Sequence, residues 1–572
     1  MKTIRRQSIF ILTAILMLTI FTIPVRAEIT APKEKEEIPE KTKVILFVNT
    51  KKQLKLKYTS KSSKVTWKSS NKKIASVTQK GRVTAKKAGK ARITAKTGNT
   101  IYTFVVTVKK KVKLKNTKGK NASDVSSLKK IIEAQILQGA SVSTDLNKTS
   151  QYVWNKKGQL TELHWYEKKL KGSLSLKKFP SLKVLECRKN ELEKLDVSKN
   201  TLLKYLDCGS NMLKKLDVSK NTLLKHLDCG WNKLAALDVS HNPSLKTLYC
   251  FHNRISAIDL SKNIKLKNLG CGSNKLTTLD VSHNPSLKTL GCSNNELTSL
   301  NVNKHINLED LDCDSNKLTT LDVSHNISLE SLHYADNEIT AIDLSKNINL
   351  RSLKCAGNGI TAIDLTNINL RYLDCSCNKL TTLDVSKNTA LQTLHCYNNN
   401  LTALDISQNH VLLHLGCSHN GITTINLSKN TNLSYLDCSY NRITGINVSK
   451  NTDLSYLDCS YNRIAGINVS KNTNLNYLDF SHNETTAINL NKNINLNDLN
   501  CSYNMLTTLD VSKNKALWTL DCKNNNLTAL DISQNFSLRS VDCTNNKITC
   551  LDISNNPFLE SYSCDNNVTV KK

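Results

Sequence analysis

Aromatic residues make up only 5% of this 572-residue chain and hydrophobic residues only 39%, so any core must be built mainly from aliphatic side chains. Catalytic motifs are missing as well. The chain has no G-x-S-x-G, no phosphate-binding loop and no paired catalytic carboxylates. Its histidines are scattered, without the HExxH motif of a zinc site. These absences argue against an enzyme and against any cofactor or metal centre.

Long hydrophobic runs are missing after the first 27 residues. Three basic residues precede an apolar run over 9–25, and Val25 and Ala27 supply the small residues of a cleavage site. We therefore predict a signal peptide over 1–27 and a mature chain that begins at Glu28 without a transmembrane segment. A membrane anchor is the alternative, although the run is barely long enough to span a bilayer. The expected location is secreted or at the cell surface.

Acidic residues are missing from 41–120, which contain 25 Lys or Arg. A charged, acidic linker over 28–41 precedes this segment, and residues 121–572 carry only about +7 of the total +33. A module with this uncompensated charge could bind anionic cell-wall polymers such as teichoic acids. It has no aromatic platform for bases, so no specific nucleic acid is expected. The alternative is that the lysines are only a solvated sheet face with protected edges.

The basic segment alternates short β-branched runs with Gly, Asn and Ser, a pattern typical of a small antiparallel sandwich. Its stretch "VTWKSSNKKIASVTQKGRVTAKKAGKARITAKTG" closely resembles the bacterial Ig-like domain of group 2 over residues 42–109. The matching positions are Trp67, Ser69, Ser70, Asn71, Ala75, Val77, Gly81, Val83, Thr84, Ala85, Gly89, Ile93 and Ala95. The resemblance implies a cell-surface spacer or adhesive module without enzymatic activity.

A basic linker over 110–122 leads to a segment, 123–159, that we expect to cover the first coil of a repeat array. Its pattern predicts one amphipathic helix with Ser123 or Asp124 as N-cap and Gly139 at its end. The stretch "QYVWNKKGQLTELHW" then predicts a hairpin.

Residues 160–572 repeat one unit, mostly every 21 residues, with the pattern L-x-x-L-x-C-x-x-N-x-[LI]-x-x-[LI]-[DN]-[VLI]-S-x-N. This is a leucine-rich repeat that resembles the nested bacterial repeats of the IRREKO class and, more distantly, the internalins. The resemblance implies binding of proteins or other surface ligands. Twenty positions occupy the Cys slot: Trp165, Cys187, Cys208, Cys229, Cys250, Cys271, Cys292, Cys313, Tyr334, Cys355, Cys375, Cys396, Cys417, Cys438, Cys459, Phe480, Cys501, Cys522, Cys543 and Cys564.

The predicted fold is mainly β: a small Ig-like β-sandwich followed by a leucine-rich repeat solenoid of about 20 coils. One unit supplies one coil, because ten extended residues are too short to enclose a two-layer core. Coils stacked at about 4.8 Å would give a rod or shallow arc roughly 90 to 100 Å long.

The Cys slot is best explained as a small buried apolar position, because Phe480, Tyr334 and Trp165 occupy it too. No disulfide is expected within the column, since neighbouring Cβ atoms would lie too far apart with parallel vectors. A column of disulfides or metal sites is the alternative. Cys377 and Cys550 lie off the column and are the candidates for oxidation.

Two polar positions recur with the repeat. The Asn three places after each slot, from Asn190 through Asn567, should bond backbone groups where the strand turns in adjacent coils. The Asp of "LDVS", as in Asp196 and Asp217, should form an Asx turn with the Ser two residues later. A column of calcium sites is the alternative, but no clustered carboxylates support it.

The predicted binding surface lies where the repeats differ most from one another, which is around the slot and not in "LDVSKN". Tyrosine is a favoured interface anchor, because it offers a large area with few rotamers and one polar tip. The alternative is that the tyrosines only stack and support the sheet. The candidate residues are Tyr435, Asp437, Tyr440, Tyr456, Asp458, Tyr461, Tyr477, Asp479, His482 and Tyr503.

The function predicted is that of a binding protein. The solenoid would hold a protein ligand, with a host surface protein as one candidate, and the basic module would fasten the chain to the envelope. One alternative is a solenoid that binds glycans or wall polymers, and another is a structural spacer.

Overall fold

The computed structural model describes residues 42–56, 65–98 and 100–572. The predicted signal peptide and the linker over 28–41 lie outside the described residues. The described residues fall into two compact units, one up to Lys110 and one from Lys111 to Lys572, which are described separately below.

The first unit is a β-sandwich of two sheets. One sheet has the order β1-β7-β6-β3 and the other β2-β5-β4. The strands are β1 Thr42–Phe47, β2 Lys51–Gln53, β3 Thr66–Ser69, β4 Ala75–Val77, β5 Arg82–Ala85, β6 Gly89–Thr97 and β7 Thr100–Lys109. Trp67 and Phe104 stack in the core with ring centroids 5.8 Å apart. Gly81 has φ +77°, and a Cβ there would lie 2.6 Å from the Trp67 ring. The predicted Ig-like sandwich is confirmed, but it is not wholly antiparallel, because β1 pairs with β7 in parallel.

The second unit begins with helix α1, Ala122–Leu137, and the antiparallel hairpin of β8, Tyr152–Trp154, and β9, Leu160–His164. The prediction of Ser123 or Asp124 as N-cap was wrong. Asn121 is the cap, and its Oδ1 accepts hydrogen bonds from both of their backbone N–H groups. Asp124 is buried instead, and its Oδ2 accepts from Leu160 N at 2.9 Å. The carboxylate therefore ties the helix to β9.

The solenoid consists of short parallel strands, one per coil, that continue in register from β9. Two further parallel pairs lie outside this sheet: β10 Lys171–Ser175 with β12 Glu191–Asp196, and β30 Cys550–Asp552 with β32 Thr569–Lys571. The main strands are β11 Val184–Glu186, β13 Tyr205–Asp207, β14 His226–Asp228, β15 Thr247–Tyr249, β16 Asn268–Gly270, β17 Thr289–Gly291, β18 Asp310–Asp312, β19 Ser331–His333, β20 Ser352–Lys354, β21 Tyr372–Asp374, β22 Thr393–His395, β23 His414–Gly416, β24 Tyr435–Asp437, β25 Tyr456–Asp458, β26 Tyr477–Asp479, β27 Asp498–Asn500, β28 Thr519–Asp521, β29 Ser540–Asp542 and β31 Ser561–Ser563.

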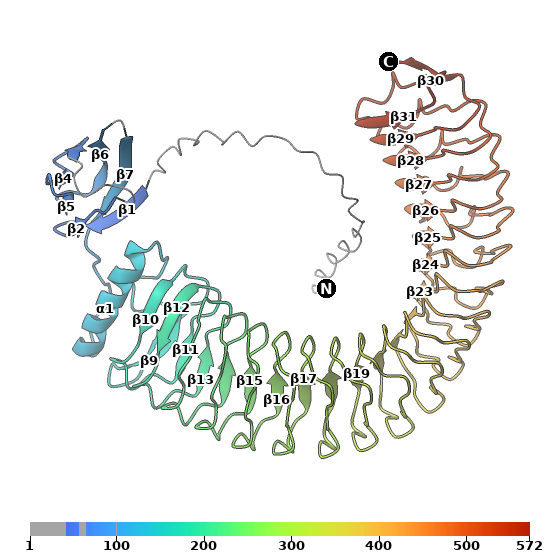
Figure 1. The fold of residues 1–572 in the computed structure, drawn as a ribbon. Helices are drawn as coiled ribbons and strands as arrows, with labels where there is room; N and C mark the ends of the chain where they lie inside the picture. The colour runs from blue at the N-terminus through green and yellow to red at the C-terminus, as the bar shows by residue number, and fades with distance from the viewer. Residues whose placement is uncertain (1–41, 57–64, 99) are drawn as a thin grey trace, which may run out of the picture. The chain divides into compact units, whose positions relative to one another are not determined.

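The solenoid unit curves strongly, and its strands line the inner side of the arc (Figure 1). The expected rod or shallow arc was wrong in this respect. Hydrogen-bonded strands hold the inner side at about 4.8 Å per coil. In the described coils between β12 and β30, the opposite side has only turns and one isolated bridge, Ile446 with Ile467, so the coils spread apart there.

The Cys slot is a buried packing position. Sixteen of the seventeen column cysteines are buried and free, and Cys564 in the last coil is half-buried. Trp165, Tyr334 and Phe480 fill the same slot with no exposed surface. Burial raises the pKa of Cys396 to about 12. The prediction that the Cys slot is a buried packing position is therefore confirmed.

A thiol titration checks this packing in solution. In the unfolded, unreduced protein we expect about seventeen free thiols, and no fewer than about fifteen, because the buried column never meets an oxidant. In the folded protein, a thiol reagent should modify the exposed Cys377 first. A majority of disulfides would contradict this packing.

Both recurring polar positions behave as predicted in the coils before the last one, where Asn567 is exposed. Asn441, three places after its slot, donates through Nδ2 to the carbonyls of Cys417, Cys438 and Ser439 at 3.0–3.1 Å. Its Oδ1 accepts from Ile422 N at 3.0 Å. Asp of the "LDVS" motif forms the Asx turn, as in Asp238, which accepts from Ser240 N and Oγ. Among the residues with described positions, no group of three His, Cys, Asp or Glu side chains could hold a metal ion.

Candidate functional site

Three neighbouring strands bring the candidate residues into two columns. β24, β25 and β26 pair in register, so that Tyr435, Tyr456 and Tyr477 lie side by side. The residues one place before the slot, Asp437 and its two counterparts, form the adjacent column. The central leucine of each strand is buried. Its flanking Tyr and Asp side chains therefore point outward from the inner face of the arc.

The tyrosine column is a stack of nearly parallel rings. Ring centroids are 4.3 Å apart from Tyr435 to Tyr456 and again from Tyr456 to Tyr477, with interplanar angles of 12° and 4°. Burial raises the pKa of Tyr456, and the neighbouring tyrosines and aspartates raise it further. The column therefore offers neutral hydroxyl groups and ring edges, while the ring faces cover one another.

The aspartate column is held by hydroxyl and amide donors. Asp437 accepts from Ser439 N at 3.0 Å and from Ser439 Oγ at 2.7 Å, and Ser418 Oγ donates to its second oxygen at 2.9 Å. Asp479 accepts from Ser481 N and, through its second oxygen, from Asn500 Nδ2, both at 2.9 Å. No described lysine or arginine forms an ion pair with this column.

Asp458, in the middle of the column, is the least satisfied of the three carboxylates. Its Oδ1 accepts from Ser460 N and Oγ, but no described group donates to its Oδ2. Burial raises its pKa to about 7, and the charges of Asp479 and Asp437 contribute to the shift. A cation placed against Oδ2 would give this oxygen a partner and would lower the raised pKa of the carboxyl group.

A second ring stack follows the strands. Tyr440, Tyr461, His482 and Tyr503 occupy the position two places after the slot, where φ is +50° to +53°. Successive centroids are 3.9–4.0 Å apart. The stack also includes His419, 4.1 Å from Tyr440, which is not one of the ten predicted residues. Its place two residues after Cys417, opposite the tyrosines of the next coils, is the signal that could have identified it.

The structure thus places all ten candidate residues on four consecutive coils, at the inner side of the arc, and we call them the concave patch. An open hollow of about 380 Å³ continues the patch toward the C-terminus, between Tyr477 and Asp542. Its lining includes Asp498 and Asp521. Lys523 forms ion pairs with Asp521 at 2.9 Å and with Asp542 at 3.7 Å. The acidic character of the patch therefore decreases toward this end.

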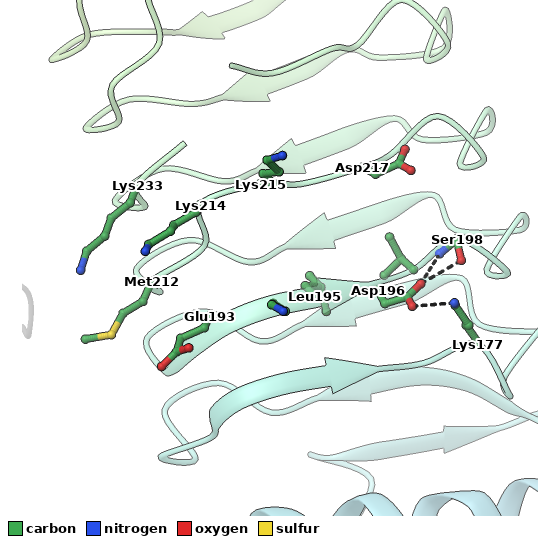
Figure 2. A pocket seen from close by; sticks show the side chains of 12 residues that line it. Lys177, Glu193, Leu195, Asp196, Ser198, Met212, Lys214, Lys215, Asp217 and Lys233 are labelled. Atoms are coloured by element: carbon green, nitrogen blue, oxygen red, sulfur yellow. Dashed lines mark hydrogen bonds and ion pairs between the residues drawn. The ribbon is translucent and has the colours of Figure 1, made fainter. Parts of the chain in front are cut away.

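A larger hollow of about 840 Å³ lies near β12, on the early coils. Figure 2 shows its lysines spread over several coils, with Lys214 and Lys215 together on one of them; Lys177 is paired to Asp196 at 2.9 Å, and Asp196 is in turn bonded to Ser198. Five lysines and three carboxylates line it, and the lysines do not converge on one point (Figure 2). This hollow lacks the convergent polar groups of a built ligand site.

The raised pKa of Asp458 predicts that the free energy of unfolding depends on the charge of this side chain. The folded-state pKa of about 7 lies above the ordinary value of about 3.9, so ionised Asp458 destabilises the fold increasingly as pH rises from about 4 to 7. Asp458→Asn keeps the Oδ1 acceptor and removes the charge. We expect it to raise the free energy of unfolding by about 1 kcal/mol above pH 7 and to have little effect near pH 4.

Denaturant unfolding at several pH values checks this result. Asp510→Asn is the matched control, because hydrogen bonds from Ser512 lower the pKa of Asp510. Its ionised form stabilises the fold, so the control should lower stability above about pH 4, with the opposite sign. A pH-independent difference for Asp458→Asn would contradict the burial of this carboxylate.

No helix in the described ranges is long and apolar enough to cross a membrane. Residues 38–108 match the bacterial Ig-like domain (group 2), and residues 272–294 match a leucine-rich repeat. A search of curated proteins finds no match.

Among solved structures, the solenoid is similar to the functional domain of InlJ from Listeria monocytogenes, which is described as including a cysteine ladder. The identity is 32% over 66% of this chain and 77% of that domain, with a TM-score of 0.52. The receptor kinase ectodomain GASSHO1/SCHENGEN3 from Arabidopsis thaliana, solved with CASPARIAN STRIP INTEGRITY FACTOR 2, shares the fold at 19% identity. That match covers 71% of this chain and 64% of the ectodomain, with a TM-score of 0.51.

Leucine-rich repeat and Ig-like families are typically non-enzymatic binding scaffolds, and the solenoid fold is typical of protein–protein interaction and adhesion. The identity to the InlJ domain extends over most of its length, and the column of buried cysteines parallels its cysteine ladder. Together with the N-terminal Ig-like module, these features show that the chain belongs to the internalin-like leucine-rich repeat proteins of bacteria.

Proposed function

We propose that this chain is a secreted or cell-surface binding protein whose concave patch holds a protein ligand, with a host surface protein as the expected partner. One observation carries the proposal: stacked tyrosines lie beside a column of aspartates with which no described lysine or arginine forms an ion pair. Tyrosine edges and hydroxyls anchor protein interfaces, and unpaired carboxylates select a basic partner.

The ring geometry favours a protein over a glycan as the ligand. Sugars bind aromatic side chains by lying on an exposed ring face, but each inner ring of both stacks is covered on its two faces. What remains accessible is a row of edges with hydroxyl or imidazole groups. A protein surface can contact such a row through hydrogen bonds and edge contacts.

The charge of the patch specifies the partner further. Asp437, Asp458 and Asp479 lie on adjacent strands, and their mutual repulsion contributes to the raised pKa of Asp458. A lysine or arginine of the ligand placed against Asp458 would lower that pKa and gain a charge-assisted hydrogen bond at Oδ2. The preferred ligand is therefore a protein that presents a basic side chain to the inner face of the arc.

A crosslinking pull-down from intact host cells tests this function. The full chain should capture one predominant protein, and glycan arrays should show no retention that depends on the patch. Retention of a glycan without any captured protein would favour the glycan-binding alternative. Capture of neither would favour the structural spacer.

For the basic module we propose attachment to anionic cell-wall polymer. Lysines on its strands, such as Lys43, Lys51 and Lys68, are exposed, and residues 41–120 contain no carboxylate that could neutralise them. Attraction of this kind is long-ranged at low salt and is screened at high salt.

We expect a fragment of residues 40–120 to bind purified teichoic acid and to release it between about 50 and 500 mM salt, because binding displaces counterions. Retention measured over a salt gradient checks this prediction. A neutral wall polysaccharide is the control and should not be retained. Retention of teichoic acid that does not depend on salt would argue against electrostatic attachment.

A further inference from the structure

A column of lysines lies on the first half of the solenoid, away from the concave patch. These residues stand four places before the slot on six consecutive coils, and all are exposed. They are Lys183, Lys204, Lys225, Lys246, Lys267 and Lys288.

Backbone hydrogen bonds fix these lysines in one row. Lys204 N donates to Lys183 O at 2.8 Å, and the same bond recurs on each following coil as far as Lys288 N to Lys267 O. The row therefore places one ammonium group per coil, at about 4.8 Å spacing, over roughly 24 Å.

The row carries almost no neutralising charge. Within the described chain only Lys288 has an ion pair, with Glu309 of the next coil. The strands of the first coils carry three carboxylates, Glu186, Asp207 and Asp228. Each lies three residues after a column lysine, and the ring or aliphatic side chain that begins the strand stands between the two. From β15 to β17 the same position holds Tyr249, Gly270 and Gly291, and no acid.

Six like charges in register disfavour the folded state, since like charges directly opposite each other repel. Recent duplication alone does not explain them, because the next residue differs between coils: Val184, Tyr205, His226, Thr247, Asn268 and Thr289. The column also ends sharply, with Glu309 and Glu330 at the next two positions. The two halves of the solenoid also differ in charge. Residues 160–308 contain 24 basic and 13 acidic residues, whereas residues 309–572 contain 20 basic and 26 acidic residues.

We propose that this lysine column is a second binding site, for a linear anionic polysaccharide that lies along the row. A chain with one carboxylate or sulfate per sugar can present one anion to each coil, and binding would remove the repulsion between lysines. Single-stranded nucleic acid fits less well, because its bases stack on exposed ring faces. The rings beside the row, Tyr205 and His226, are stacked on each other at 4.2 Å.

Acetylation footprinting of the full chain tests the proposal with heparin as the sulfated probe and polygalacturonate as the carboxylated probe. The column lysines should be protected from acetylation. The polysaccharide should not protect the exposed lysines of the "SKN" turns, such as Lys199, Lys220 and Lys262. Equal protection of both sets would overturn the proposal. Displacement of either polysaccharide by single-stranded DNA at equal charge concentration would overturn the assignment to polysaccharide.

Two charge-matched variants give an independent measurement. One replaces the six column lysines by Gln, and the other replaces Lys199, Lys220, Lys262, Lys304, Lys346 and Lys387 by Gln. Both leave residues 41–120 unchanged. The column variant should bind heparin about tenfold more weakly than the control variant at low salt. Glu309→Lys with Glu330→Lys extends the row and should tighten binding. Identical affinities of the two Gln variants would refute the site.

Discussion

Replacing Asn462 by alanine is expected to lower the free energy of unfolding by about 2–4 kcal/mol. Asn462 Nδ2 donates to the carbonyls of Cys438, Cys459 and Ser460 at 3.0–3.1 Å, and its Oδ1 accepts from Ile443 N at 2.9 Å. The side chain is only 9% exposed. Alanine would leave four backbone groups in two adjacent coils without this partner, and buried unpaired polar groups are costly.

Denaturant unfolding with hydrogen exchange measures this effect, and the Ile443 amide should lose its protection. Asn468→Ala in the same coil is the matched control, because exposed Asn468 accepts a single hydrogen bond, from Ser470 N. The control should cost less than about 1 kcal/mol. Asn462→Asp should be at least as harmful as alanine, since a carboxylate would face three carbonyls. Equal effects of Asn462→Ala and Asn468→Ala would show that the buried amide does not join the coils.

Tyr456→Ala is expected to weaken binding of the protein ligand by about 1–3 kcal/mol, which corresponds to roughly 5- to 150-fold in Kd. Tyr456 is the central ring of its column and lies next to Asp458. Its removal deletes the middle of the contact surface and separates Tyr435 from Tyr477. The affinity for the protein captured from host cells, measured by calorimetry, checks this expectation.

Tyr456→Phe distinguishes a tyrosine that contacts the ligand from one that only supports the sheet, because it keeps the ring stack and removes only the hydroxyl. We expect it to fold as the native chain does and to lose a smaller part of the affinity. If Tyr456→Ala loses stability but keeps its affinity, the tyrosines serve only to support the sheet.

The repeat could be predicted from sequence to the level of single side chains. Phenylalanine, tyrosine and tryptophan in the Cys slot predicted a packing position, and Phe480 is indeed fully buried. The invariant Asn and the "LDVS" Asp had local partners at fixed spacing, so their hydrogen bonds followed from one unit of the pattern. Periodicity also placed Tyr435, Tyr456 and Tyr477 in one column.

Features that depend on several coils at once could not be predicted. The curvature reflects unequal spacing on the two sides of the coils, which no single repeat encodes. The raised pKa of Asp458 arises from burial together with the charges of Asp437 and Asp479 on adjacent strands. The helix N-cap was misassigned because a tertiary hydrogen bond to Leu160 takes up the side chain of Asp124, leaving the cap to Asn121.

The measurement that tests the central claim most directly compares two triple variants for binding to the captured ligand. One replaces Tyr435, Tyr456 and Tyr477 by alanine, and the other replaces the exposed Lys450, Lys471 and Lys492, in the turns outside the sheet, by alanine. With both variants shown to be folded by circular dichroism, the tyrosine variant should lose at least about tenfold in affinity and the lysine variant should bind as the native chain does. Unchanged affinity of the tyrosine variant would contradict the assignment of the concave patch as the binding surface.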